Sequence, residues 1–150
     1  MIVRVQNVAF DFSEEVKLFQ AATKYSGAIV TFSGIVRDVN GDLDYMLIEH
    51  YPGMTENALE KFSAASKVKF DLEHVLVIHR FGVLRPGEII MMVATASKHR
   101  KDAFSGADYL MDYLKSRAPF WKKEVVLGHP DGAWVDSKVI DETALKAWSN

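Results

Sequence analysis

The chain contains no cysteine among its 150 residues. Disulfide bonds, thiolate nucleophiles and cysteine-based zinc sites are therefore excluded, and the composition fits a reducing compartment. No apolar run approaches the roughly 18 residues that a membrane-spanning helix needs. The N-terminus also lacks the basic segment and the long apolar run of a signal peptide. These absences predict a cytoplasmic protein that does not enter a membrane.

The net charge is small, because 18 Lys and Arg residues face 20 Asp and Glu residues. This balance gives no support for a nucleic-acid partner. Several common site motifs are also missing: there is no phosphate-binding loop, no Gly-x-Gly-x-x-Gly and no Gly-x-Ser-x-Gly. The histidines lack metal-ligand spacing, since His-x-x-x-His does not occur. The sequence therefore predicts neither a metal nor a cofactor.

What is present is an ordinary globular composition, 49% hydrophobic and 25% charged, which predicts one domain over residues 1–150. Helices are predicted to begin with N-caps at Ser13, Thr55 and Ser97, and residues 141–148 form a short helix or a tail. The predicted strands lie near residues 2–8, 27–36, 43–51, 75–78, 89–96, 121–126 and 133–135. Because strands occur in neighbouring pairs between helices, we expect an α+β fold with a mixed or antiparallel sheet and three main helices.

The clearest helix pattern ends just before Pro119, which stops the helix. Its apolar positions at helical spacing are Ala103, Phe104, Ala107, Leu110, Met111 and Leu114. Four cations then surround Phe120 and Trp121, which either wall a pocket or belong to the core: Lys115, Arg117, Lys122 and Lys123. A cationic cluster at a turn forced by proline predicts an anion site.

Further cations stand at the ends of predicted elements. Arg37 follows a strand, and His99 with Arg100 lies where a helix N-terminus already favours anions. Each of these charges alone is more often a solvated surface group. The pair at positions 79–80 ends a buried strand and is expected to serve packing or a turn, and His50 at a strand end is more often structural than catalytic.

His99 and Lys115 are sixteen positions apart. If the helix between them is unbroken, they are about 24 Å apart and cannot touch one small ligand from the same chain. Either the two residues serve different sites, or a second copy of the chain brings its His99 and Arg100 to the first copy's lysines.

Five ordered segments of the sequence carry specific residue patterns: Gly27–Arg37, Leu47–Met54, Val77–Gly82, Ser97–Arg100 and Met111–Lys122. Together they resemble the large, catalytic subunit of molybdopterin synthase. The resemblance runs from about Gly27 to about Val135, and Met111–Lys122 is its most specific segment.

The resemblance implies a fold of the α/β-hammerhead type and a sulfur transferase of molybdenum cofactor biosynthesis. Such enzymes convert a cyclic pyranopterin monophosphate, precursor Z, into molybdopterin by inserting two dithiolene sulfurs. The sulfur arrives on the C-terminal thiocarboxylate of a small ubiquitin-like subunit. The implied assembly is a homodimer of large subunits within a heterotetramer.

The resemblance also implies that Lys115 and Lys122 are catalytic. Its implied substrate-binding residues are Arg37, His99, Arg100, Lys123, Glu124, Ile35 and Val36. Ile35 replaces a residue that is often basic or polar in relatives, so we expect it to act through its backbone, and Lys138 lies where relatives often carry arginine. Neighbouring cations and partial burial would lower the pKa of a lysine and suit it to proton transfer. For Lys115 this leaves three roles open: general acid or base, covalent link, or holder of charge.

Two other classes of function compete with this interpretation. A non-catalytic module would bind a ubiquitin-like partner or an anionic ligand without turnover. A purely structural dimer would leave the cluster of cations unexplained. Incubation with precursor and thiocarboxylated small subunit discriminates among the three.

Overall fold

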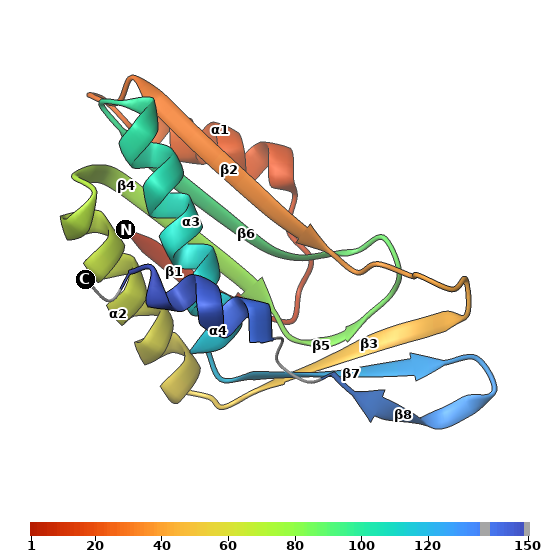
Figure 1. Cartoon of the computed structure of the whole chain (residues 1–150). Helices are drawn as coiled ribbons and strands as arrows, with labels where there is room; N and C mark the ends of the chain where they lie inside the picture. The colour runs from red at the N-terminus through yellow and green to blue at the C-terminus, as the bar shows by residue number, and fades with distance from the viewer. Residues whose placement is uncertain (136–138, 149–150) are drawn as a thin grey trace.

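The computed structural model describes residues 1–135 and 139–148 and confirms the α+β class (Figure 1). Its strands form two four-stranded sheets in place of the single sheet that we predicted, with the orders β1-β4-β6-β2 and β5-β3-β7-β8. The first sheet is mixed because β1 runs parallel to β4, whereas the second is antiparallel. The elements are β1 (Ile2–Gln6), α1 (Phe12–Ala22), β2 (Ala28–Ile35), β3 (Leu43–His50), α2 (Met54–Lys69), β4 (Leu72–Arg80), β5 (Gly82–Leu84), β6 (Ile89–Ser97), α3 (Arg100–Ser116), β7 (Phe120–Val126), β8 (His129–Trp134) and α4 (Val139–Lys146).

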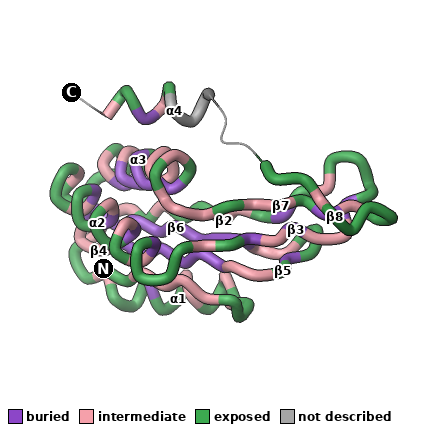
Figure 2. Tube along the Cα trace, turned by 90° about the horizontal axis from the view of Figure 1, so that it is seen from below, coloured by how far each residue is buried: buried purple, intermediate pink, exposed green. Residues whose placement is uncertain are grey.

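Helices cover both faces of the first sheet, with α1 on one face and α2 and α3 on the other (Figure 2). Its central strands β4 and β6 are apolar along most of their length, as expected for strands buried on both faces. On one face, Phe19 of α1 packs with Leu76 and Ile78 of β4. On the other, Leu59 of α2 and Leu110 of α3 join the larger core cluster.

The second sheet extends away from the helices, and the β7–β8 hairpin projects furthest (Figure 1). Its buried side chains come mainly from β3, where Leu43, Met46 and Ile48 are almost inaccessible to solvent. By contrast, Trp121 on β7 and Trp134 on β8 are 48% and 54% exposed. This sheet therefore presents large side chains at the surface.

The predicted N-cap of the first helix is wrong. Asp11 caps α1, and its carboxylate accepts a hydrogen bond from the Glu14 N–H at 3.0 Å. Ser13 lies inside the first turn and donates its hydroxyl hydrogen to the same carboxylate. A carboxylate interacts more strongly than a hydroxyl with the positive end of a helix, which explains why Asp11 and not Ser13 is the N-cap.

The other two predicted caps are also wrong. The N-cap of α2 is Gly53, whose φ of 81° is accessible to glycine at little cost, and Thr55 is the second residue of the helix. Ser97 is the last residue of β6 and is buried, and the N-cap of α3 is His99.

Two short elements complete the chain. Strand β5 was missed because three residues are too few to show a periodicity. Helix α4 packs on α3, so the helix is the correct one of the two alternatives predicted for residues 141–148. Lys138 lies outside the described residues. In the described part of the chain, no helix is long and apolar enough to cross a membrane.

Candidate functional site

Lys115 and Lys122 lie on either side of a tight, well-anchored turn between α3 and β7. The Arg117 N–H donates to the Tyr113 carbonyl at 2.8 Å and closes the helix. The buried Thr55 hydroxyl donates to the Tyr51 carbonyl at 2.9 Å and also lies 3.3 Å from the Pro119 carbonyl. The turn therefore fixes the last helical lysine, Lys115, relative to the start of β7, and α2 holds it in place.

Lys122 is half-buried and lies next to a buried histidine. On β7 it shares a face with Phe120, two residues earlier. Phe120 stacks on His79 with a 3.6 Å separation of ring centroids and an interplanar angle of 16°. Burial lowers the pKa of His79 to about 3, and the positive charge of Lys122 also lowers it. A neutral imidazole therefore stands beside this lysine at physiological pH.

Lys123 and Glu124 point to opposite faces of β7, because side chains alternate along a strand. Lys123 pairs with Trp134, and its Nζ lies 5.7 Å from the centre of the indole ring. Glu124 is exposed and shares the face of Lys122. Of the two residues, only Glu124 therefore lies on the same side of the sheet as Lys122.

The predicted residues at the end of β2 differ in accessibility. Ile35 is 54% exposed and Arg37 is also exposed, whereas Val36 between them is only 2% exposed. The Val36 N–H donates to the Glu88 carbonyl at 2.9 Å, and its own carbonyl accepts from the Gly87 N–H at 2.9 Å. The structure thus does not bring the Val36 side chain to the surface, and it places Ile35 and Arg37 there.

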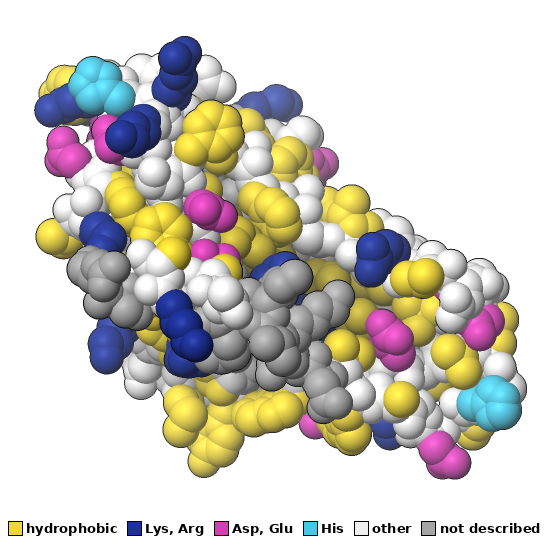
Figure 3. Space-filling view, in the orientation of Figure 1, with side chains coloured by type: hydrophobic (Ala, Val, Ile, Leu, Met, Phe, Trp, Pro, Cys, Tyr) yellow, Lys and Arg dark blue, Asp and Glu magenta, His cyan; other side chains and the backbone are white. Residues whose placement is uncertain are grey.

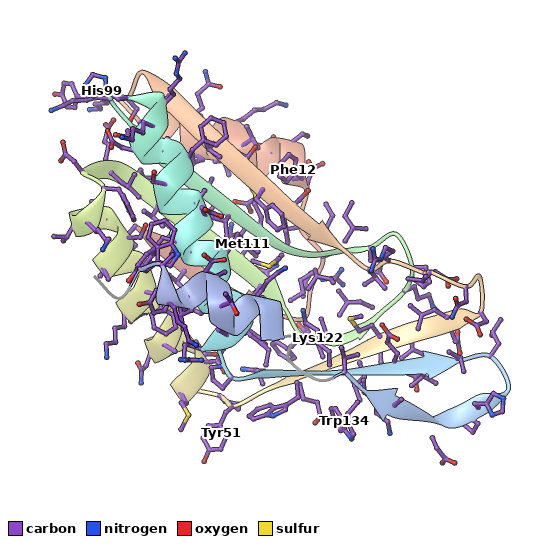
Figure 4. The ribbon with its side chains drawn as sticks, in the orientation of Figure 1. Phe12, Tyr51, His99, Met111, Lys122 and Trp134 are labelled. Carbon is purple, nitrogen blue, oxygen red and sulfur yellow. The ribbon has the colours of Figure 1, made fainter. Side chains whose placement is uncertain are left out.

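His99 and Arg100 are exposed at the N-terminal end of α3. Helix α3 is continuous from Arg100 to Ser116, so the helix between His99 and Lys115 is unbroken, as the estimate of about 24 Å between them requires. Figure 4 shows His99 at the end of the molecule that is remote from Lys122. Within one chain the structure therefore does not bring the His99–Arg100 pair to the two lysines.

An aromatic surface lies on the other side of β7 from Lys122. Trp121 shares this face of β7 with Lys123, which pairs with Trp134, and Tyr51 is 57% exposed. Figure 3 shows hydrophobic side chains gathered at this edge of the molecule, where Figure 4 labels Tyr51 and Trp134. The aromatic surface gives the second sheet a contact area that the sequence did not reveal, because its members come from separate segments.

The sequence also left two histidines outside the site that the structure places near it. His50 lies with its ring centroid 4.5 Å from that of Phe81 and 6.1 Å from that of Phe120. His79 is buried, as its position in an apolar strand predicted. Neither position could be linked to Lys122 before the pairing of β3 with β7 was known. Among the described residues, no three His, Asp or Glu side chains gather in a way that could hold a metal ion.

The chain is similar to known proteins along its whole length. A family model described as MoaE protein matches residues 5–117. A molybdopterin synthase catalytic subunit from Cereibacter sphaeroides is 53% identical over 148 residues, which cover 99% of this chain and 100% of that protein. One from Pseudomonas aeruginosa is 44% identical over 150 residues and covers 99% of each chain.

Solved structures agree with the sequence relatives. A molybdopterin biosynthesis MoaE protein from Burkholderia ambifaria superposes with a TM-score of 0.84 at 44% identity, covering 99% of this chain and 98% of that one. A molybdopterin synthase from Staphylococcus aureus gives a TM-score of 0.79 at 27% identity, covering 88% and 95%. A complex of subunits 1 and 2 of the molybdopterin-converting factor from Helicobacter pylori shares the fold at 22% identity with a TM-score of 0.77, covering 91% of each chain.

Proposed function

Because this chain belongs to the MoaE protein family, we propose that it is the catalytic subunit of a molybdopterin synthase. It converts the cyclic pyranopterin monophosphate, precursor Z, into molybdopterin by inserting two dithiolene sulfurs, each taken from the C-terminal thiocarboxylate of one small ubiquitin-like subunit. The observation that carries this proposal is the full-length similarity to catalytic subunits of that enzyme. The chain acts as one domain over residues 1–150, in the cytoplasm, without a nucleic-acid or membrane partner.

Lys115 and Lys122 form the catalytic pair of the proposal. Both substrate groups, a phosphate and a thiocarboxylate, are anions, and holding them together requires cations. The anchored turn between α3 and β7 supports this assignment, because it fixes the two lysines on adjoining elements. Lys122 holds the thiocarboxylate or stabilises developing negative charge, and Lys115 acts as an acid or base, as a covalent link or as a holder of charge.

The substrate phosphate takes its cations from two copies of the chain. Arg37 comes from one copy, with the exposed Ile35 beside it and Val36 as its anchor in the core. His99 and Arg100 come from the other copy, because they lie about 24 Å along α3 from Lys115 in their own chain. Lys123 and Glu124 act at the rim of the site on opposite faces of β7.

Strand β2 offers a surface for this homodimer. It is an edge strand of the first sheet, and its Ile29 and Phe32 are 37% and 39% exposed. One end of β2 adjoins the start of α3, where the Gly27 N–H donates to the Ser97 carbonyl, and the other end leads to Arg37. Antiparallel pairing of two copies of β2 would place the His99 end of one copy beside the Arg37 end of the other.

One reconstitution tests the function. The purified chain is incubated with precursor Z and thiocarboxylated small subunit, and the dithiolene product is detected. Product formation supports a sulfur transferase, whereas binding of the small subunit without product would support the non-catalytic module.

Light scattering at micromolar concentration tests the shared site separately. We expect the mass of a dimer. A strict monomer that still forms product would overturn the contribution of the second copy and leave the catalytic function standing.

A further inference from the structure

Arg80 and Glu88 form an ion pair, and neither residue has a role in the proposed function. Arg80 Nη1 lies 3.0 Å from Glu88 Oε1 and also donates to the Ile89 carbonyl at 3.1 Å. The Arg80 side chain is only 8% exposed, and that of Glu88 is 38% exposed. A buried guanidinium without a partner is strongly unfavourable, so the carboxylate holds this arrangement in place.

Hydrogen bonds of the turn that contains Glu88 connect the ion pair to the backbone next to Arg37. The second carboxylate oxygen of Glu88 accepts from the Arg85 N–H at 2.6 Å and closes the turn between β5 and β6. The backbone of the same turn, at Gly87 and Glu88, holds Val36 through two hydrogen bonds of 2.9 Å. Because Val36 directly precedes Arg37, the turn sets the position from which the Arg37 side chain extends.

The backbone of Arg80 connects the ion pair to the surroundings of Lys122 through His79 and Phe120. The Arg80 carbonyl lies 2.8 Å from His79 Nδ1, and because a carbonyl can only accept, this nitrogen carries the proton. The hydrogen bond fixes the imidazole ring that stacks on Phe120. Phe120 precedes Lys122 by two residues on the same face of β7. The backbone of Arg80 thus supports the packing beside the lysine, and its side chain ties this end of β4 to Glu88 and to the Ile89 carbonyl.

We propose that Arg80 and Glu88 are positioning residues that set the spacing between Arg37 and Lys122, and thereby the affinity of the site for its anionic pterin substrate. The inference rests on the proposed function, which assigns Arg37 and Lys122 to that substrate. The ion pair acts through these two residues. Loss of the Glu88 charge removes the compensation of Arg80 and loosens the turn that holds Val36.

Steady-state kinetics of Glu88→Gln test the proposal in the reconstituted complex. We expect KM for the pterin to rise about tenfold, as for the loss of one charge-assisted hydrogen bond, while kcat changes less than about twofold. Glu60→Gln, on the exposed side of α2, is the matched control and should leave both constants unchanged. An unchanged KM in Glu88→Gln, or an equal fall in kcat, would overturn the inference.

A double-mutant cycle with Arg37→Ala separates positioning from general loosening. If Glu88 acts through Arg37, Glu88→Gln should not raise KM further in the Arg37→Ala background. If the two substitutions raised KM independently, by factors that multiply, Glu88 would not act through Arg37. Arg80→Lys, which keeps the charge and loses the forked geometry, should reproduce the rise in KM if Glu88→Gln folds poorly.

Hydrogen exchange gives a readout that does not depend on activity. The Val36 amide should exchange at least about tenfold faster in Glu88→Gln than in the wild type, while amides in the centre of β4 keep their protection. Unchanged exchange at Val36 would refute the positioning role even in an active enzyme. A wild-type chain that yields no dithiolene product would refute the proposed function and leave this structural test intact.

Discussion

Strand β4 of the first sheet buries six consecutive side chains, whereas strand β7 of the second sheet buries one. Helices lie on both faces of β4, but β7 pairs with β3 and β8 in a sheet that extends away from the helices. The first sheet therefore supplies most of the apolar burial that stabilises the fold. The second sheet leaves Lys122, Lys123 and the aromatic surface near solvent, where a substrate or a partner can reach them.

Among these substitutions we expect the largest effect at Lys115, near the end of α3, where the chain enters β7 of the second sheet. Lys115→Ala should lower sulfur transfer by about 10²- to 10⁴-fold if Lys115 acts on the reacting atoms as we propose. The melting temperature, dimerisation and binding of the small subunit should stay close to wild type. Product formation is measured with thiocarboxylated partner, and Lys61→Ala on the exposed face of α2 is the control. Near wild-type turnover in Lys115→Ala would refute the assignment.

A substitution in the first sheet should show the reverse pattern. Ile78→Ala on β4 should lower the free energy of unfolding by about 2–5 kcal/mol, because Ile78 is fully buried between the sheet and α1. Trp121→Ala on β7 should cost less than about 1 kcal/mol, since Trp121 is half exposed. Urea unfolding measures both values. Equal losses of stability would show that the two sheets do not differ in this way.

His79 connects the two sheets and should make the stability sensitive to acid. Its pKa is about 3 in the fold and near 6.5 in the unfolded chain, so between these values only the unfolded chain binds the proton. The free energy of unfolding should therefore fall as the pH drops from about 6.5 towards 3, by up to roughly 1.4 kcal/mol per pH unit. Denaturant unfolding at several pH values should show a shallower dependence for His79→Gln. The exposed His129→Gln is the control, and identical slopes for His79→Gln and wild type would contradict the buried neutral state.

We expect the smallest effect from a substitution of Arg100, at the end of α3 that lies far from β7. Arg100→Ala should weaken binding of precursor Z about tenfold and leave affinity for the small subunit almost unchanged. Calorimetric titration of the two ligands measures the difference. Equal affinity for the precursor in wild type and variant would speak against a phosphate role for Arg100.

The order of elements was largely predictable from the sequence, because it follows from local periodicity. The apolar spacing of α3 and the β-branched runs of β2, β4 and β6 give the pattern of helices and strands. Helix starts were predicted less well, because several polar residues compete locally for each cap, and Asp11 formed the cap where Ser13 was expected. The cationic turn after α3 was also visible, since Lys115, Pro119 and Lys122 are close in the chain.

The division of the strands into two sheets was decided only by the tertiary structure, because strand pairing joins segments that are far apart in sequence. The pairing of β3 with β7 brings His50 opposite Phe120, and the packing of β4 brings His79 against the same ring. The turn that holds Val36 likewise depends on residues about fifty positions away. The sequence determined which residues carry charge at the ends of elements, and the fold determined which of them meet, because loop closure and burial act over distances that local patterns do not describe.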